Sequence, residues 1–135
     1  SRKYFKEYIS KRMALKQMLQ PSHYRYLSFQ IWQEGIARYT EYAFVKSLRN
    51  YQPTFEMLQM GDYEDFKSYE DKMYLSELGF LLNQKIEQDK RICFYAIGFA
   101  EGLLLSKYSP KWQDRYLVNK FYIEDYFEKS NSFKR

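Results

Sequence analysis

The acidic side chain Glu34 and the glycine after it interrupt an otherwise aromatic and aliphatic segment, Trp32–Glu41. An ionised carboxylate among large apolar neighbours is costly unless a partner or a ligand compensates its charge. Gly35 adds a second local cost, since glycine destabilises a helix by about 0.5–1 kcal/mol relative to alanine. Two adjacent penalties predict a site at Glu34.

The spacing of the charged residues allows a structural explanation of Glu34. At the helical period, Glu34, Arg38 and Glu41 fall on one side of a helix. In this interpretation Arg38 bridges the two carboxylates on a solvated face, and Gly35 lets a neighbouring helix come close.

The segment resembles the second metal-binding helix of zinc metallopeptidases of the gluzincin type, in which a Glu followed by Gly-x-Ala-x-Tyr is the third zinc ligand. Two histidines one helical turn apart supply the other protein ligands of that family, and water takes the fourth position. The resemblance implies that Glu34 is the metal ligand and Gly35 the small neighbour that keeps space clear. It places Arg38, Tyr39 and Glu41 as pocket candidates beside the metal.

A second stretch extends the resemblance. Residues 94–102 and 110–116 are similar to the C-terminal helices of uncharacterised bacterial proteins of this metallopeptidase-like group. The likeness covers roughly residues 24–127 and implies that the chain follows a His-Glu-x-x-His helix. An upstream part of the same protein would then be its partner, and zinc would be the cofactor of the complete protein.

The chain departs from the family at the histidines. His23 is its only histidine, and it stands beside Pro21 in a predicted connection between two helices. One His and one Glu do not make a tight zinc site, so His23 is predicted to be a surface residue. We expect the 135 residues alone neither to bind zinc nor to hydrolyse peptides.

A second acid, Glu101, is also predicted to lie among apolar residues. Glu101 lies on the most apolar helix of the chain, and Gly102 follows it. If that helix is central, the carboxylate needs a partner, for which Arg38 and Arg91 are candidates. Gly98 and Gly102 have the spacing that lets another helix pack closely.

One interpretation of Glu101 is therefore a structural buried ion pair. The alternative is that Glu34, Arg38 and Glu101 line one pocket with Tyr95 or Tyr39. In that pocket a tyrosine hydroxyl could stabilise an oxyanion, which makes Tyr95 and Arg38 the candidate catalytic residues.

Apolar residues recur at helical spacing along the chain, and no alternating strand pattern exceeds four residues. The sequence predicts an all-α fold, a compact bundle of five or six helices in one domain over residues 1–135. In the helix of residues 24–51, a stripe with Phe29 and Trp32 is expected in the core. The helices are predicted over residues 2–19, 24–51, 54–59, 63–89, 91–107 and 110–119, and residues 122–127 add a final turn.

Charge is unevenly distributed, although the net charge is only +5. Residues 1–20 carry six basic side chains and one acid, and residues 56–79 carry seven acids and two lysines. We expect these segments to pair with each other, which makes nucleic-acid binding the weaker explanation of the asymmetry. With fifteen Tyr and eleven Phe, the alternatives to a metallopeptidase part are a helical protein-interaction module and a small-molecule or nucleic-acid binder.

The remaining features set limits on the protein's environment. No apolar run is long enough to span a bilayer. Cys93 is the only cysteine, which excludes an internal disulfide, and we expect a buried core thiol. A single apolar cysteine fits the cytosol, whereas metallopeptidases are often exported, so the compartment stays open. The chain opens on Ser1 without a methionine, and we expect it to be a piece of a longer protein.

Overall fold

The computed structural model describes residues 2–118 and 120–131 and confirms the all-α bundle, since every regular element in that part of the chain is helical. The longer elements are α1 (Arg2–Met18), α2 (Pro21–Gln30), α3 (Ile36–Ser47), α5 (Phe66–Asn83) and α7 (Cys93–Tyr108). The shorter ones are α4 (Phe55–Leu58), α6 (Ile86–Asp89), α8 (Trp112–Tyr116) and α9 (Glu124–Asn131). A π-helical segment, η1 (Ile31–Gly35), joins α2 to α3, and a 3-10 turn, η2 (Lys90–Ile92), precedes α7.

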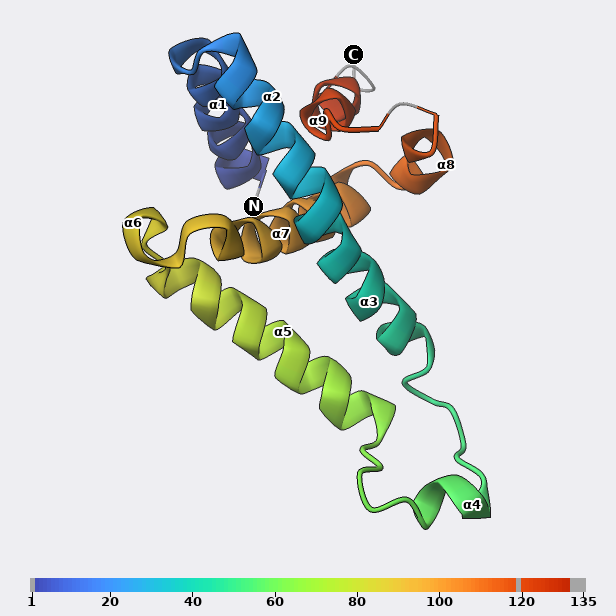
Figure 1. Cartoon of the computed structure of the whole chain (residues 1–135). Coiled ribbons are helices and arrows are strands. Elements are labelled where there is room, and N and C mark those ends of the chain that lie inside the picture. The colour runs from blue at the N-terminus through green and yellow to red at the C-terminus, as the bar shows by residue number, and fades with distance from the viewer. Residues whose placement is uncertain (1, 119, 132–135) are drawn as a thin grey trace.

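The elements α2, η1 and α3 form one long rod from Pro21 to Ser47 (Figure 1). The rod begins at Pro21, earlier than the predicted residue 24, because proline is well accommodated in the first turn of a helix. Its middle is π-helical, and the Ile36 N–H bonds to the Ile31 carbonyl five residues back. Such single π turns are frequent at functional sites.

Helix α7 crosses the middle of the rod and is the centre of the bundle (Figure 1). The crossing is close enough for backbone contact, since a Cβ on Gly35 would lie 2.5 Å from the Phe94 carbonyl oxygen and 2.8 Å from the Gly98 nitrogen. One turn further on, the Tyr39 ring fills the space beside Gly102. The predicted close approach of a helix at these glycines is confirmed.

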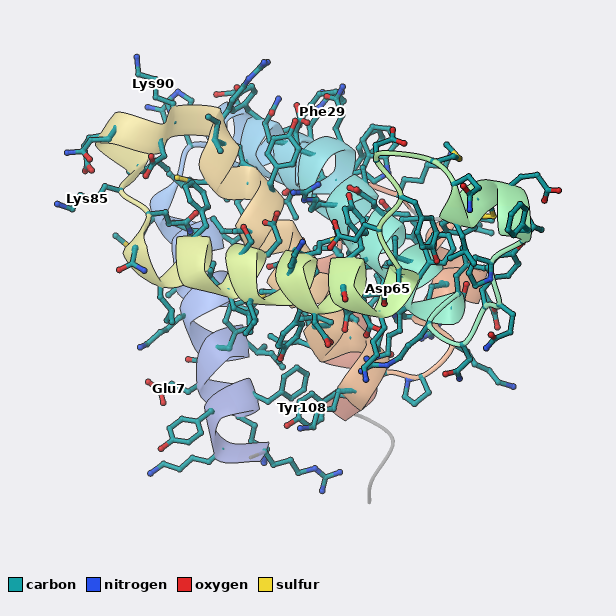
Figure 2. All side chains as sticks on the ribbon, turned by 90° about the horizontal axis from the view of Figure 1, so that it is seen from below. Glu7, Phe29, Asp65, Lys85, Lys90 and Tyr108 are labelled. Atoms are coloured by element: carbon teal, nitrogen blue, oxygen red, sulfur yellow. The ribbon has the colours of Figure 1, made fainter. Side chains whose placement is uncertain are left out.

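Helix α5 packs along α3 and α7 and begins at Asp65, whose Oδ1 accepts a hydrogen bond from the Ser68 N–H at 2.9 Å. Figure 2 shows Asp65 at this end of α5, and Lys85 and Lys90 on either side of α6 at the other. Helix α4 lies at the far end of the molecule, on the connection between α3 and α5 (Figure 1).

The N- and C-terminal helices complete the core. In α1, the Phe5 ring stacks on Tyr108 of α7 with centroids 4.1 Å apart and meets Phe127 of α9 edge-on at 5.8 Å. Trp112 of α8 is 1% exposed, and Cys93 is buried as predicted. None of the described helices has the length and apolar character needed to cross a membrane.

Candidate functional site

Arg38 of the rod forms a charged network with α5, called here the Arg38 cluster (Arg38, Glu41, Tyr69 and Glu77). Its Nε lies 2.6 Å from a Glu77 oxygen, and its Nη1 lies 2.8 Å from a Glu41 oxygen. The Tyr69 hydroxyl donates a hydrogen bond to the other Glu41 oxygen at 3.0 Å. Arg38 therefore pairs with Glu41 as the spacing indicated, but its second partner is Glu77 and not Glu34.

Glu34 lies instead beside Tyr95 of α7. The Tyr95 hydroxyl interacts with its carboxylate, and this interaction is the main reason that the pKa of Tyr95 is raised. A phenol is protonated at neutral pH, so Tyr95 presents a neutral hydroxyl to the half-buried Glu34 side chain. Arg38, the nearest arginine of the same rod, is paired with Glu77 and Glu41 instead of Glu34.

A cavity of about 380 Å³ opens beside these groups. The described residues that line it are Arg38, Ser76, Glu77, Phe80, Ile92 and Tyr95. It lies where α3, α5 and the start of α7 meet. Of the predicted site residues, the structure thus brings Glu34, Arg38, Glu41 and Tyr95 into one neighbourhood, with Arg38 and Tyr95 in the cavity wall.

Glu101 belongs to a different place. It is 0% exposed, its carboxylate accepts a hydrogen bond from the Tyr8 hydroxyl, and the Arg12 Nε lies 3.0 Å from the same oxygen. The expectation that Arg38 or Arg91 neutralises Glu101 is wrong, because this side of α7 faces α1. The interpretation as a buried structural ion pair fits the observed contacts, and the single pocket uniting Glu101 with Glu34 and Arg38 does not.

A second buried acid shares the same guanidinium. Glu124 of α9 is 1% exposed, lies 3.7 Å from Arg12 Nη2 and 3.5 Å from Lys16 Nζ, and accepts a hydrogen bond from the Tyr24 hydroxyl. We call the six groups Tyr8, Arg12, Lys16, Tyr24, Glu101 and Glu124 the Arg12 cluster. It joins α1, α2, α7 and α9, segments far apart in the sequence.

Burial is the largest cause of the pKa shifts of Glu101, Tyr8 and Tyr24 in the Arg12 cluster. Desolvation raises the pKa of Glu101, while the Arg12 charge and the Tyr8 hydroxyl oppose that rise. It also raises the pKa values of Tyr8 and Tyr24, whose hydroxyls face carboxylates. Two buried acids share the buried Arg12, and the partly exposed Lys16 adds a second positive charge at Glu124, so the cluster holds its helices together by charge compensation.

Tyr39, the other predicted pocket tyrosine, is a core residue. It is 7% exposed, its hydroxyl bonds to the Ser106 hydroxyl, and Gln113 donates to it at 3.4 Å. The rod turns this side chain toward Gly102 and α8, so it lies apart from the cavity at Arg38 and Tyr95. The expectation that Tyr39 lines a pocket with Glu34 is wrong.

The described residues do not fit a zinc ion. Among them, no three His, Cys, Asp or Glu side chains come together closely enough to hold a metal. His23 is exposed, as predicted, and lies eleven residues before Glu34 on the rod, which is about 16 Å along a helix axis. Zinc at Glu34 would need nitrogen ligands from outside these residues.

Within the part of the chain that the structure describes, the basic residues of α1 and the acidic residues 56–79 do not form the ion pairs that the sequence predicted between them. The cations of α1 pair with Glu7, Glu101 and Glu124, and the acids of residues 56–79 pair with Arg38, Arg49 and Lys72. Among the ion pairs of the described residues, the expected pairing between the two segments is wrong. Each segment finds its counter-charges on the helices it packs against.

Sequence reasoning missed two residues that organise these clusters. Arg12 continues the apolar face of α1 one turn after Tyr8 and is 6% exposed. Glu77 lies on the buried face of α5, one turn after Met73, and is 7% exposed. In both cases a charged residue in line with apolar positions at helical spacing was the available signal.

Comparison with protein-family models, curated proteins and solved structures found no match to this chain. The relation to metallopeptidases therefore stays a prediction that rests on the residues around Glu34 and on residues 94–102 and 110–116.

Proposed function

We propose that this chain is the helical part of a zinc-dependent metallopeptidase-like protein, in which Glu34 supplies a carboxylate ligand while Arg38 and Tyr95 form part of the pocket wall. The observation that carries the proposal is the state of Glu34, a half-buried carboxylate held by a neutral tyrosine hydroxyl while Arg38 is engaged with Glu77 and Glu41. Metal-binding carboxylates are commonly oriented by such hydrogen bonds.

Two features of the backbone support the same proposal. Glu34 lies within the π-helical turn, and π turns are frequent at functional sites because they place side chains where an α-helix would not. Gly35 brings α7 against the rod next to Glu34, so Tyr95 can reach the carboxylate. Both features form from this chain alone.

The proposal assigns the chain no activity by itself. Zinc of this type would need two imidazole ligands from another segment of the protein, the His-Glu-x-x-His helix that the resemblance implies. What these residues contribute is an oriented carboxylate, a phenol that donates to it, and a guanidinium fixed at the edge of the adjoining cavity.

The proposal is tested on the full protein encoded around these residues. We expect a His-Glu-x-x-His motif upstream and about one zinc per molecule by elemental analysis. Glu34→Gln should weaken zinc binding by about 10- to 100-fold or more, since it removes a direct ligand. Glu87→Gln, at an exposed position on α6, is the control and should bind zinc as the wild type does.

Three outcomes would contradict the proposal. The first is a complete protein without two imidazoles near Glu34. The second is an unchanged zinc affinity in Glu34→Gln with the helical circular-dichroism signal intact. The third is zinc binding by residues 1–135 alone, because the described side chains offer no set of ligands.

A helical protein-interaction module is the second candidate function, and exposed apolar side chains around α4 favour it. Phe55 is 72% exposed, Leu58 54% and Met60 56%, on a segment that extends away from the other helices (Figure 1). The occupant we test is a second copy of this chain. If the chain self-associates, the molar mass measured by light scattering should rise as the protein concentration rises. Phe55→Ser should reduce that rise. A monomer at all concentrations would exclude self-association.

A further inference from the structure

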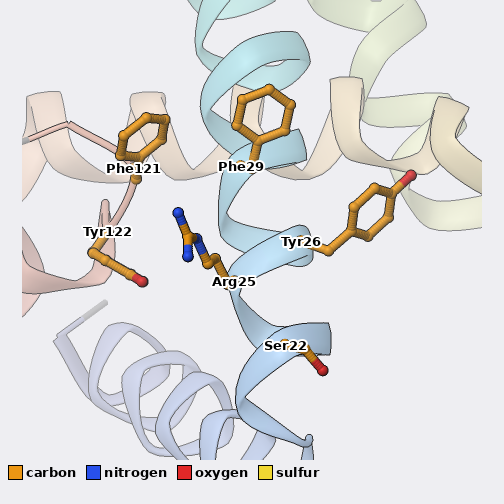
Figure 3. Close-up of a pocket in the computed structure, with 6 residues that line it drawn as sticks. All are labelled: Ser22, Arg25, Tyr26, Phe29, Phe121 and Tyr122. Carbon is orange, nitrogen blue, oxygen red and sulfur yellow. The ribbon is translucent and has the colours of Figure 1, made fainter.

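A second cavity, of about 550 Å³, lies between the start of the rod and the chain that leads into α9 (Figure 3). Its volume is typical of sites for small organic molecules. We call it the aromatic pocket, and its described lining residues are Ser22, Arg25, Tyr26, Phe29, Phe121 and Tyr122. Four of the six are aromatic, and no acid is among them.

Aromatic contacts shape the apolar wall of the pocket. The Phe29 and Phe121 rings lie 6.1 Å apart, and Trp32 packs beside both, 5.7 Å from Phe29 and 4.8 Å from Phe121. Phe29 was predicted in the core, yet it is 37% exposed, and Phe121 is 43% exposed. These rings are held by one another while each leaves a face or edge open to the cavity.

The backbone at Phe121 is unusual. Its φ of 70° lies in the left-handed region, which costs a non-glycine residue about 1–2 kcal/mol. In this conformation its ring packs against Trp32 and Phe29 at the pocket. A costly conformation at a bulky side chain is thus coupled to the formation of this wall.

One cation extends into the aromatic pocket. Figure 3 shows the Arg25 guanidinium between the rings of Tyr122 and Tyr26 and below Phe29 and Phe121. Glu124, an acid of α9 two residues after Tyr122 in the chain, is buried and engaged with Arg12, Lys16 and Tyr24. A guanidinium beside aromatic faces fits a planar ligand that carries an anionic oxygen group, since it can pair with two oxygens at once.

We propose that the aromatic pocket binds a small aromatic anion, whose ring packs on Phe29 and Phe121 while its carboxylate or phosphate pairs with Arg25. The ring and the anionic group of the ligand are both needed, because an ion pair between a surface arginine and an isolated anion contributes little binding free energy. The site lies apart from the zinc-ligand role of Glu34, and its test uses different residues and no metal.

Three probes that share one ring separate the contributions: 2-naphthoate, 2-naphthyl phosphate and the neutral 2-naphthamide. The two tryptophans are built-in reporters in proton–nitrogen NMR spectra. Trp32 touches the pocket wall, and Trp112 is buried in the core. We expect saturable shifts of the Trp32 indole signal with the Trp112 signal unchanged, and at least tenfold tighter binding of one or both anions than of the amide. The stronger anion identifies the carboxylate or the phosphate as the preferred group.

Two variants and a control test the assignment of residues. Arg25→Gln should reduce anion affinity to that of the amide, because it removes the charge and keeps the rings. Phe121→Gly, which suits the left-handed backbone, should weaken binding of all three probes. Arg91→Gln, an exposed arginine before α7, should change none of them. Equal affinities for anions and amide, an unchanged Arg25→Gln variant, or shifts centred on Trp112 would each overturn the proposal.

Discussion

Gly35→Ala adds a single methyl group where the rod crosses α7, and the contacts at this crossing indicate how much the substitution destabilises the fold. The new Cβ would lie 2.5 Å from the Phe94 carbonyl oxygen and 2.8 Å from the Gly98 nitrogen. Carbon atoms in good contact are about 3.5–4.0 Å apart, so the two helices would have to separate by about 1 Å. Both neighbours are backbone atoms, so no side chain can rotate out of the way.

The expected free-energy change has two opposing parts. Alanine gains about 0.5–1 kcal/mol over glycine from helix propensity. Overpacking costs about 1–3 kcal/mol and sometimes more, and a backbone clash at the central crossing belongs at the upper end. We expect Gly35→Ala to lower the free energy of unfolding by about 2 kcal/mol.

Gly79→Ala is the matched control. Gly79 lies within α5, and a Cβ there would meet nothing within 4 Å. The same substitution should therefore raise the free energy of unfolding by about 0.5–1 kcal/mol. The two variants should differ by about 3 kcal/mol, or roughly 10 °C in melting temperature for a domain of this size.

Urea unfolding followed by circular dichroism measures both variants under the same conditions. The reasoning fails if Gly35→Ala is as stable as the wild type, or if the two variants shift stability in the same direction. Gly98→Ala adds its methyl group to the other side of the same crossing and should behave like Gly35→Ala.

Two further predictions concern the Arg12 cluster and the tyrosines. Arg12→Met leaves the buried Glu101 and Glu124 without their shared guanidinium and should lower the free energy of unfolding by about 3–5 kcal/mol. Lys11→Met, at a 77% exposed side chain, is the control and should change the free energy of unfolding little. Equal effects of the two substitutions in urea unfolding would refute the role of Arg12. Burial raises the pKa values of Tyr8, Tyr24 and Tyr116 in the folded protein. Above about pH 10 the native state therefore binds more protons than the unfolded chain. The free energy of unfolding should fall as pH rises through that region. Phenolate absorbance and circular dichroism should then change together for these tyrosines, and complete ionisation of all tyrosines before any loss of helix would contradict their burial.

The local elements followed from the sequence because helices depend on near neighbours. The apolar period predicted the all-α class and the approximate positions of the helices, and Pro21 ended one helix and began the next. The predicted bounds 24–51 and 63–89 were too long, since α3 ends at Ser47 and the second range divides into α5 and α6. The Glu34-Gly35 step was also recognisable, since a charge and a glycine inside an apolar helix are local anomalies. The pairing of Arg38 with Glu41 came from the same short-range spacing.

The tertiary structure decided the long-range partners. Sequence spacing could not show that Arg12 would reach Glu101, eighty-nine residues away, or that Glu77 would be the second partner of Arg38. It could not show the π turn either, or that Phe29 would lie at a pocket instead of in the core. Periodicity fixes which side chains share a helix face, but only the packing of helices decides what that face meets. For Glu34, the sequence determined that a carboxylate stands in an apolar helix, and the fold decided that Tyr95 and not Arg38 holds it.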